Sequence, residues 1–349
     1  MSDPVGSPAA QGAVPDLVLG PVLGPVLGSV LGAVVIGRNE GARLIRCLAS
    51  VAGQAGRIIY VDSGSTDGSV AAARAAGAEV VELDMSRPFT AARARNAGLE
   101  RLCADPAILY IQFIDGDCEL QPGWTRTAQA FLDRHPRAAI ACGRLRERFA
   151  QASVYNRLCD AEWDTPVGQS RSCGGIAMIR SAALAEVGGY DPSLIAGEEP
   201  EMCVRLRTLG WQIWRLDAEM ALHDAAMTRF SQWWTRTRRG GHAAAQGMAM
   251  HGRGPERLGV AMVRRALIWG LALPVLTLLT AAFLGPWALG LLLIYPAQIL
   301  RLARRYGGTR AAWERAVFLL LGKFAEVTGI VEYATRQLTG RRAGIIEYK

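Results

Sequence analysis

The sequence predicts an α/β fold, a mostly parallel sheet flanked by helices, followed by a membrane-associated helical region at the C-terminal end. Two observations lead to this prediction. From residue 32 on, short runs rich in β-branched residues alternate with Ala- and Leu-rich helical stretches, an alternation typical of parallel strands covered by helices. From Ala266 to Leu300 the chain has no charged residue, and a run of this length between basic flanks is typical of membrane segments.

Changes in composition divide the chain into three parts. Residues 1–31 are rich in Pro, Gly and Ala and contain the imperfect repeat "VLGPVLGPVLGSVLG", which interrupts any helix and predicts a flexible low-complexity tail. Residues 32–255 carry the strand and helix pattern and are expected to form the globular domain. Residues 256–349 are expected to form a membrane hairpin and an amphipathic helical region.

The expected strands and helices of the globular domain follow one another in order. Four strand-like runs, "AVVIG", "RIIYVD", "EVVELD" and "ILYIQFID", precede the helical stretches "EGARLIRCLASV", "DGSVAAARAAG", "AARARNAGLERL" and "PGWTRTAQAFLDRHP", and a fifth run, "AAIACG", comes next. In such sheets ligands bind where parallel strands end at their carboxyl edge. Asp62 and Asp115 end two of these runs, so we expect both at a binding site.

The uncharged C-terminal run is broken in its middle by Gly285 and Pro286. Each half is at or below the roughly 20 residues that a full span needs, so two short spans, a re-entrant hairpin and an interfacial pair all fit. Arginines flank the run on both sides: Arg264, Arg265, Arg301, Arg304 and Arg305. By the positive-inside rule both ends face the cytoplasm, which favours a hairpin over one crossing. A buried hairpin of a soluble protein is the alternative.

The segment "AAWERAVFLLLGKFAEVTGIVEYATRQLTGRR" follows with apolar residues at helical spacing. It predicts an amphipathic helix that lies on the bilayer surface or, alternatively, packs against the globular domain.

The charge and cysteine content narrow the classes of partner and compartment. The formal net charge is +8, and its position near the apolar run, without a nucleic-acid motif, favours anionic lipid and predicts no nucleic-acid partner. The seven cysteines include no C-x-x-C pair, and no cleavable signal is recognised. These features predict a reducing, cytosolic setting without disulfides or zinc.

The stretch "FIDGDCEL" places Asp115 and Asp117 one residue apart at the end of an apolar strand. Two carboxylates so placed can hold Mg²⁺ or Mn²⁺, cations that prefer oxygen ligands and usually bridge to substrate phosphates. A nucleotide diphosphate is a fitting substrate. A solvated acidic loop is the alternative reading of these two residues alone.

Two further stretches carry candidate residues. "VDSGSTDGS" makes a turn after Asp62, whose carboxylate could accept hydrogen bonds from a base or ribose, and the chain lacks both a P-loop and a G-x-G-x-x-G turn. "GEEPEMCVRLRTLGW" begins a helix with Glu198, Glu199 and Glu201. Such glutamates complement the helix dipole, the reading we favour for Glu201, or one of them can deprotonate a hydroxyl acceptor.

Taken in order, six stretches of the chain resemble the family-2 glycosyltransferases, inverting sugar transferases with the GT-A fold. The stretches are "VVIGRNE", "VDSGSTDGS", "ARNAGLE", "FIDGDCEL", "CGGIAMIRSAALAEVGGYDPSL" and "GEEPEMCVRLRTLGW". The resemblance covers about residues 32–215 and makes residues 32–255 the expected GT-A catalytic domain.

The resemblance implies a donor site. Asp62 would contact the nucleotide base, Asp115 the ribose or the metal, and Asp117 the metal that bridges the diphosphate. Arg95, in the "RNAG" stretch, would help hold the nucleotide, with an exposed helix arginine as the alternative. Gly174 and Gly175 would let the backbone approach the donor sugar.

The resemblance also implies a base and a further metal ligand. Relatives read Glu-Asp at the late acidic motif, with the Asp as base; the matching residue here is Glu199, and Glu198 is the second candidate. His223 would be a metal ligand, as a histidine at this place is in some relatives, or a structural histidine. Trp163 is expected on the acceptor side.

The expected function is therefore that of a metal-dependent inverting glycosyltransferase using Mg²⁺ or Mn²⁺. It would move a sugar from a nucleotide-diphosphate sugar to a hydroxyl of a lipid or lipid-linked glycan, in cell-envelope polysaccharide or glycolipid synthesis. The expected location is the inner (cytoplasmic) membrane, with the catalytic domain facing the cytoplasm. The alternatives are a non-catalytic membrane-bound sugar-nucleotide sensor or scaffold, and a sugar-phosphate nucleotidyltransferase.

Overall fold

The computed structural model describes residues 30–340. The tail expected for residues 1–31 therefore lies outside the described residues except for its last two. Of these, Leu31 already belongs to the first strand.

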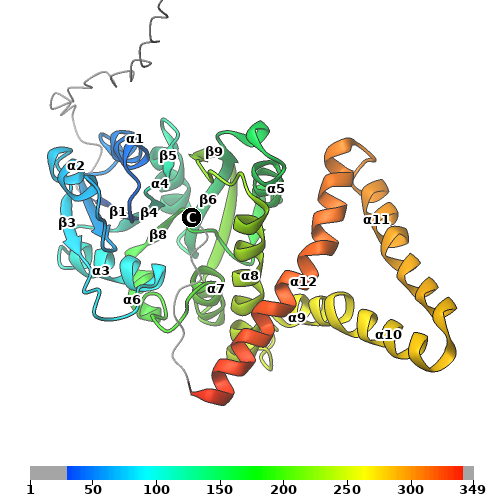
Figure 1. The fold of residues 1–349 in the computed structure, drawn as a ribbon. Helices are drawn as coiled ribbons and strands as arrows, with labels where there is room; N and C mark the ends of the chain where they lie inside the picture. The colour runs from blue at the N-terminus through cyan, green and yellow to red at the C-terminus, as the bar shows by residue number, and fades with distance from the viewer. Residues whose placement is uncertain (1–29, 341–349) are drawn as a thin grey trace, which may run out of the picture.

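The first half of the sheet is parallel, as the sequence predicts. Its four strands lie in the order β3-β2-β1-β4 (Figure 1), and each pair within this half runs parallel. The expected runs and the observed elements agree closely, and β2 matches its run at both ends. The elements are β1 (Leu31–Gly37), α1 (Ala42–Val51), β2 (Arg57–Asp62), α2 (Ser69–Ala75), β3 (Glu79–Glu82), α3 (Ala91–Cys103) and β4 (Tyr110–Asp115).

The second half of the sheet departs from simple parallel alternation. β8 lies antiparallel between β4 and β6, and β6 is parallel to β9. The run "AAIACG" thus begins β6. This strand does not pair with β4, because β8, which comes later in the chain, lies between them. The elements are β5 (Cys118–Leu120), α4 (Trp124–Arg134), β6 (Ala138–Glu147), α5 (Val154–Trp163), β7 (Gly168–Ser170), β8 (Ala177–Arg180), α6 (Ser181–Val187), α7 (Glu198–Thr208), β9 (Gln212–His223) and α8 (Phe230–His251).

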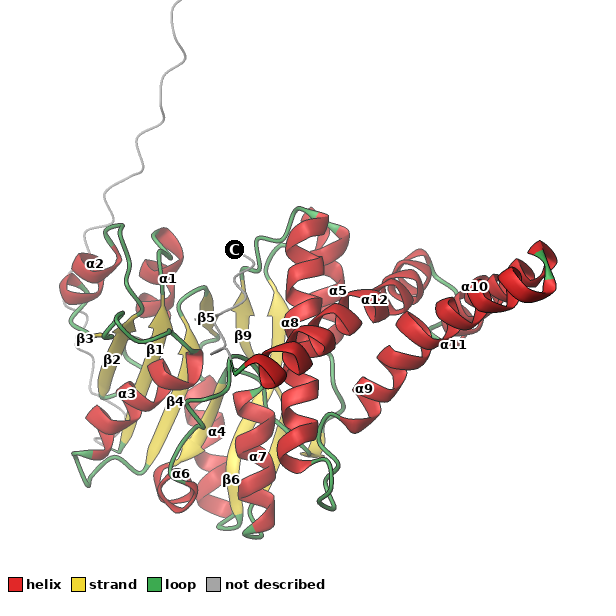
Figure 2. Cartoon of the chain, turned by 60° about the horizontal axis from the view of Figure 1, so that its bottom comes forward, coloured by secondary structure: helices red, strands yellow, loops and turns green. Residues whose placement is uncertain are grey.

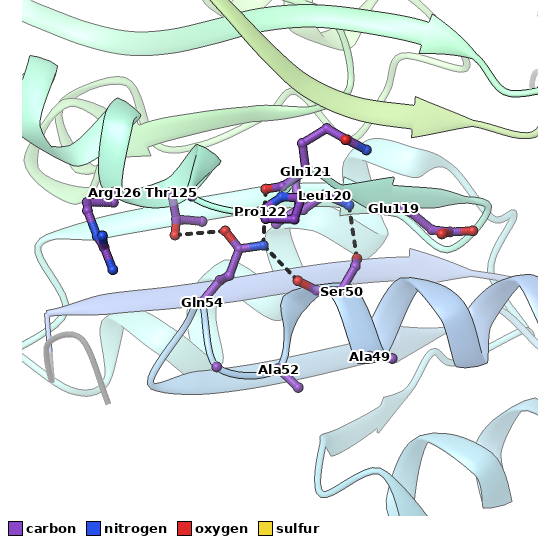
Figure 3. A pocket seen from close by; sticks show the side chains of 12 residues that line it. Ala49, Ser50, Ala52, Gln54, Glu119, Leu120, Gln121, Pro122, Thr125 and Arg126 are labelled. Atoms are coloured by element: carbon purple, nitrogen blue, oxygen red, sulfur yellow. Dashed lines mark hydrogen bonds between the residues drawn. The ribbon is translucent and has the colours of Figure 1, made fainter. Parts of the chain in front are cut away.

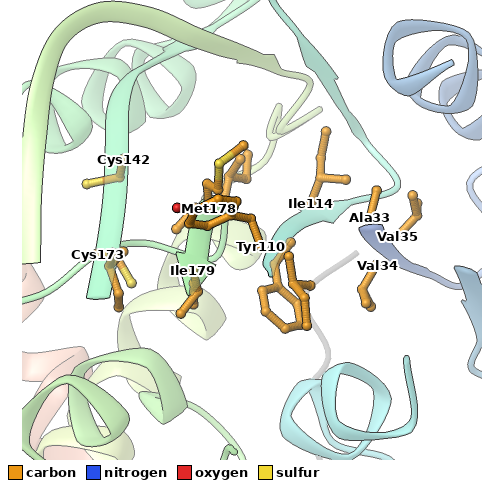
Figure 4. Packing of buried hydrophobic residues seen from close by; sticks show 14 of the residues in the cluster. Ala33, Val34, Val35, Tyr110, Ile114, Cys142, Cys173, Met178 and Ile179 are labelled. Carbon is orange, nitrogen blue, oxygen red and sulfur yellow. The ribbon is translucent and has the colours of Figure 1, made fainter. Parts of the chain in front are cut away.

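The sheet is covered by helices on both faces (Figure 2), and its central strands are therefore buried on both sides. Ala33, Val34 and Val35 of β1 are each fully buried, which explains why this strand is a continuous apolar run without alternation. Figure 4 shows side chains of β1, β4, β6 and β8 in this core. Two buried polar side chains in this core form a hydrogen bond with each other: the Trp124 indole N–H donates to Gln112 Oε1 at 2.9 Å.

The C-terminal region projects from the globular domain as a triangle of helices (Figure 1). Its elements are α9 (Val260–Leu267), a π-helical turn (Ile268–Ala272), α10 (Leu273–Leu284), a 3-10 helix (Pro286–Leu293), α11 (Ile294–Arg305) and α12 (Arg310–Thr339). Two stretches, Val260–Leu284 and Pro286–Arg305, are long and apolar enough to cross a membrane.

Helix α12 packs against α8 of the globular domain, the second of the two arrangements that its sequence allowed. Trp233 of α8 and Phe318 of α12 meet edge to face, with ring centroids 4.9 Å apart. The backbones also approach closely, because a Cβ on Gly329 would lie 2.0 Å from the carbonyl oxygen of Arg238. The C-terminal region is thus joined firmly to the domain that carries the candidate site.

Candidate active site

A cleft of about 600 Å³ opens at the carboxyl ends of β1 and β4. Its walls are formed by the loop after β1, α3, the β4–β5 turn, the loop before β8, the start of α7, the end of β9 and α8. The residues predicted from the sequence that line this cleft are Arg95, Asp115, Asp117, Gly175, Glu198, Glu199 and His223. Residues far apart in the chain meet here because the sheet brings the ends of its strands to one edge.

Asp117 and His223 face each other across the β5–β9 pair. The two strands are antiparallel with Cys118 opposite His223, and His223 Nε2 lies 3.5 Å from Asp117 Oδ2. One ligand atom each from Asp117, Cys118 and His223 lie within 4.8 Å of one another. Burial, and then the charge of Asp117, raises the pKa of the Cys118 thiol well above its usual value. Asp117 and His223 are therefore the members of this group suited to a divalent cation.

Glu147 orients His223 from behind, and sequence reasoning missed it. Its Oε2 lies 3.3 Å from His223 Nδ1 and accepts the backbone N–H of Ala225 at 3.1 Å, while its Oε1 accepts from Asn156 at 3.2 Å. Such a carboxylate behind a histidine fixes the ring and leaves the other nitrogen for a metal. No clear signal for it exists in the sequence, because the strand-like run "AAIACG" ends at Gly143 and only the structure extends β6 to Glu147.

Trp163 also contacts His223. Its ring meets the imidazole edge to face, with centroids 4.7 Å apart. The indole was expected on the acceptor side, and the structure places it against the candidate metal ligand.

Arg95 is buried at the base of the cleft and joins three carboxylates. Its Nη2 is 3.0 Å from Asp115 Oδ1, and its Nη1 is 2.7 Å from Glu198 Oε1 and 2.9 Å from Glu199 Oε1. The alternative of an exposed helix arginine is wrong, because only 2% of Arg95 is exposed. Helix α3 can bury it because Gly98 lets the helix lie directly on Val34 of β1, where a Cβ would clash at 2.4 Å.

Asp115 forms an ion pair with Arg95. It does not belong to the group of close ligand atoms formed by Asp117, Cys118 and His223. Its side chain is 37% exposed, so it can reach a ligand in the cleft. Its part in binding ribose or metal stays a prediction.

Glu198 and Glu199 begin α7 after Gly197, whose φ of 79° is left-handed. Both pair with Arg95, but the Glu198 side chain is 5% exposed and the Glu199 side chain 14%. Burial, with the charge of Glu198 as the second cause, raises the pKa of Glu199 to about 7. A carboxylate with such a pKa can accept a proton near neutral pH, which makes Glu199 the better base candidate.

Glu201 lies in the first turn of α7, where the sequence favours a carboxylate that complements the helix dipole, and the structure adds two ion pairs. It pairs with Arg205 at 2.7 Å and with His251 at 3.0 Å.

The two candidate glycines differ in their surroundings. A Cβ on Gly175 would lie 2.6 Å from Arg95 Nη2, 3.1 Å from Asp115 Oδ2 and 3.1 Å from Glu199 Oε1. Gly174 has no described atom within 4 Å of such a Cβ. Gly175 is thus the glycine that the cleft requires, because it lies between the candidate base and the carboxylate of β4.

Asp62 lies outside the cleft lining and is 3% exposed. Its Oδ1 accepts the Tyr60 hydroxyl at 2.9 Å, and its Oδ2 accepts the backbone N–H groups of Gly64 and Ser65 at 2.9 and 2.8 Å. These bonds hold the turn after β2, and contact with a nucleotide base stays a prediction.

A second hollow, of about 590 Å³, lies between the end of α1 and the β5–α4 turn (Figure 3). The side-chain amide of Gln54, at the centre of this hollow, already has hydrogen-bond partners within the protein. Its Nε2 donates to the carbonyl oxygens of Ser50 at 2.8 Å and Gln121 at 3.3 Å, and its Oε1 accepts from the Thr125 hydroxyl at 3.3 Å. It gathers no group of candidate ligands, so the chemistry belongs to the first cleft.

Residues 33–169 match the family model described as Glycosyl transferase family 2. Among solved structures, a mannosyltransferase from Pyrobaculum calidifontis, in complex with GDP-Man and Mn²⁺, has a TM-score of 0.61 at 17% identity. The match covers 86% of each chain, and this likeness concerns the fold.

Curated relatives are similar over part of their length. The pre-mycofactocin glycosyltransferase of Mycobacterium tuberculosis is 25% identical over 60% of this chain and 45% of its own. The succinoglycan biosynthesis protein ExoA of Rhizobium meliloti is 26% identical over 46% of this chain and 52% of its own. A TPR repeat-containing protein of Synechococcus elongatus is 36% identical over 36% and 29%. The chain spans about half or less of the length of these relatives.

Proposed function

We propose that the chain transfers a sugar from a nucleotide-diphosphate sugar to a hydroxyl acceptor, a proposal supported by the match of residues 33–169 to the glycosyl transferase family 2 model and by the likeness in fold to a mannosyltransferase. The observation that carries the proposal is the meeting of two groups in one cleft. The Asp117–His223 pair, backed by Glu147, suits a divalent cation, and Glu199, held by Arg95, suits proton removal.

The residues present fit Mg²⁺ or Mn²⁺. Asp117 and His223 already face each other, and Glu147 fixes the histidine ring in the orientation that a ligand needs. In the proposed site Asp117, His223 and the exposed Asp115 would hold the cation. When bound, the cation would neutralise charge on the departing diphosphate.

The proposed reaction is a single displacement. Glu199 takes the proton of the acceptor hydroxyl, and the oxygen attacks the anomeric carbon on the face opposite the leaving nucleoside diphosphate. The configuration at that carbon is therefore inverted. Arg95 positions both Glu199 and Asp115. Arg38, Arg43 and Arg239 line the same cleft, and their charge suits an anionic donor. In this proposal Asp62 would support the nucleotide side, and of the two glycines Gly175 would face the donor sugar, because Gly174 does not line the cleft.

The proposed acceptor is a lipid or a lipid-linked glycan used in cell-envelope polysaccharide or glycolipid synthesis. Two apolar helical stretches at the C-terminal end support attachment to a membrane. Residues 32–255 would form the catalytic domain, and residues 256–349 the membrane hairpin and amphipathic helical region. With both basic flanks on the cytoplasmic side, the catalytic domain would face the cytoplasm at the inner membrane.

The test is the release of nucleoside diphosphate by detergent-purified protein from UDP-, GDP- and dTDP-sugars, with Mn²⁺ or Mg²⁺ and a membrane lipid extract as acceptor. Release that requires the metal and is lost in Asp117→Ala and Glu199→Gln is expected. Release of pyrophosphate from a sugar phosphate and a nucleoside triphosphate would instead identify a nucleotidyltransferase. Nucleotide binding without turnover of any donor would identify a sensor or scaffold.

A further inference from the structure

The arms of the C-terminal hairpin are apolar on every side. We define the hairpin as residues 266–300 and its tip as residues 283–287. Large apolar side chains of α10 that point in different directions are exposed, such as Leu276 at 54%, Leu278 at 65% and Leu279 at 51%, while the small Thr277 between them is buried. At the tip, Phe283 is 83% and Trp287 74% exposed. A helix that is apolar all round belongs in a protein core or in lipid, and the described residues bury only 6% of the first apolar stretch and 11% of the second.

The charges around the hairpin complement an anionic surface. From Leu258 to Trp313 the chain has six arginines and no aspartate or glutamate. Within the hairpin itself there is no charge, so the arginines gather at its two ends: Arg264, Arg265, Arg301, Arg304, Arg305 and Arg310. Each basic residue near an anionic leaflet contributes about 1 kcal/mol of attraction. This pattern commits the apolar surface to lipid in preference to a second protein chain.

The geometry of the arms argues against two full crossings. Residues 266–284 give an arm of about 28 Å, and residues 286–300, partly 3-10 helical, an arm of at most about 27 Å. Both uncharged lengths are slightly below the roughly 30 Å hydrocarbon core, so the longer helices Val260–Leu284 and Pro286–Arg305 could cross it only by drawing their terminal arginines toward the lipid. Figure 1 shows α10 and α11 diverging from the tip, while α12 closes the third side. Diverging arms cannot both stand along the membrane normal, so the depth that they reach is smaller still.

The composition of the tip leads to the same conclusion. It reads "FLGPW" and contains no polar side chain. A tip that emerged in water on the far side of a membrane would have to expose Phe283, Leu284 and Trp287 there, at a cost of about 1.5–3 kcal/mol for each large apolar side chain.

We propose that the hairpin is a wedge that enters an anionic lipid bilayer tip first from one side and returns to the same side. The basic ends of its two arms lie in the headgroup layer of the leaflet that it enters, and the tip stays within the lipid. This inference goes beyond the proposed sugar transfer and does not depend on it.

Close helix packing fixes the wedge to the cleft. A Cβ on Gly270, at the root of the first arm, would lie 2.4 Å from the Lys323 carbonyl oxygen of α12, and one on Gly241 of α8 would lie 2.2 Å from the Glu326 carbonyl oxygen. Helix α8 in turn contributes Arg239 to the wall of the cleft. The wedge therefore holds the cleft at a set position above the leaflet that it enters.

The experiment places a fluorescent NBD group at the tip. It measures whether the group is quenched by lipids and whether dithionite bleaches it from outside or inside the vesicle. The full chain carries Trp287→Cys in a Cys103→Ser background, because Cys103 is the exposed cysteine among the described residues. The labelled protein is reconstituted into vesicles of phosphatidylcholine and phosphatidylglycerol. Phe149→Cys, also an exposed aromatic but on the globular domain, is the matched control and should be bleached at once by external dithionite.

For the tip label, lipids with a deep doxyl group should quench the NBD emission at least twofold, and dithionite on neither side should bleach it. Bleaching by dithionite in the lumen would show a spanning hairpin and overturn the proposal. Bleaching by external dithionite as fast as in the control would show a tip in water, with the same consequence. Protection from dithionite without lipid quenching would reveal a protein partner, which also contradicts the proposal.

The role of the arginines is tested with the same label. For this test the labelled protein is added from dilute detergent to preformed vesicles. Replacing phosphatidylglycerol by phosphatidylcholine should then slow the onset of lipid quenching at least tenfold, because the attraction of several arginines is lost. An unchanged rate would refute the part of the proposal that concerns anionic lipid.

Discussion

The glycine between the candidate base and the carboxylate of β4 is the position where the smallest change should have a large effect. In Gly175→Ala, the new Cβ would stand 2.6 Å from Arg95 Nη2, against about 3.4 Å for an ordinary contact. Some group must therefore move by about 0.8 Å. Arg95 cannot yield easily, because its side chain is 3% exposed and its guanidinium pairs with three carboxylates. The displacement should thus pass to Glu199 or Asp115.

The size of the effect follows from these distances. Overpacking a well-packed site costs about 1–3 kcal/mol of stability, which lowers Tm by about 1–4 °C for a chain of this size. A misplacement near 1 Å at a reacting group costs up to about 100-fold in rate. We therefore expect kcat/KM for Gly175→Ala to fall about 10- to 100-fold while the protein stays folded.

The assay combines nucleoside-diphosphate release with thermal unfolding, and the neighbouring glycine supplies the control. Gly174→Ala makes the same chemical change where no described atom lies within 4 Å, so its kcat/KM should stay within about twofold of the wild type. Wild-type kcat/KM and Tm in Gly175→Ala would refute the close approach. An equal loss in both variants would show that the loop, and not the contact with Arg95, sets activity.

Three further predictions concern the other groups of the cleft. Glu147→Gln should weaken Mn²⁺ binding about 10- to 100-fold, because the ring of His223 loses its charged partner; unchanged affinity in a Mn²⁺ titration would contradict this. Since the pKa of Glu199 is raised to about 7 and a base must be ionised, kcat/KM should fall as the pH drops below about 7; a flat profile from about pH 5 to 8 would exclude this base. Arg95→Lys should lower the free energy of unfolding by about 3–5 kcal/mol, because one ammonium cannot serve three carboxylates. The exposed Arg101→Lys on the same helix should change it by less than about 1 kcal/mol in denaturant titrations, and equal effects would argue against the buried network.

The sequence predicts well those features of the fold that depend on local pattern. The first four strands and their helices appear at the expected runs, because apolar β-rich segments and amphipathic helices are encoded over a few residues. The antiparallel insertion of β8 between β4 and β6 was missed. Strand pairing between segments distant in the chain depends on tertiary packing, which local pattern does not contain.

The same distinction applies to the site. Asp117, His223 and Glu199 could be named from their motifs, and the structure brings them to one cleft. The burial of Arg95 was not visible, because it depends on how closely α3 lies on β1. Glu147 was missed because its role exists only through the pairing of β6 with β9, where Glu147 stands opposite His223.

The separate roles of Asp117 and Glu199 are tested most directly by calorimetric titration of the purified protein with a nucleoside diphosphate, with and without Mn²⁺. We expect Mn²⁺-dependent binding in the wild type and its loss in Asp117→Ala. Glu199→Gln should bind with near wild-type affinity yet release no nucleoside diphosphate from the donor sugar. Equal binding with and without Mn²⁺, or equal loss of binding in both variants, would contradict a cleft in which Asp117 holds the metal and Glu199 acts as the base.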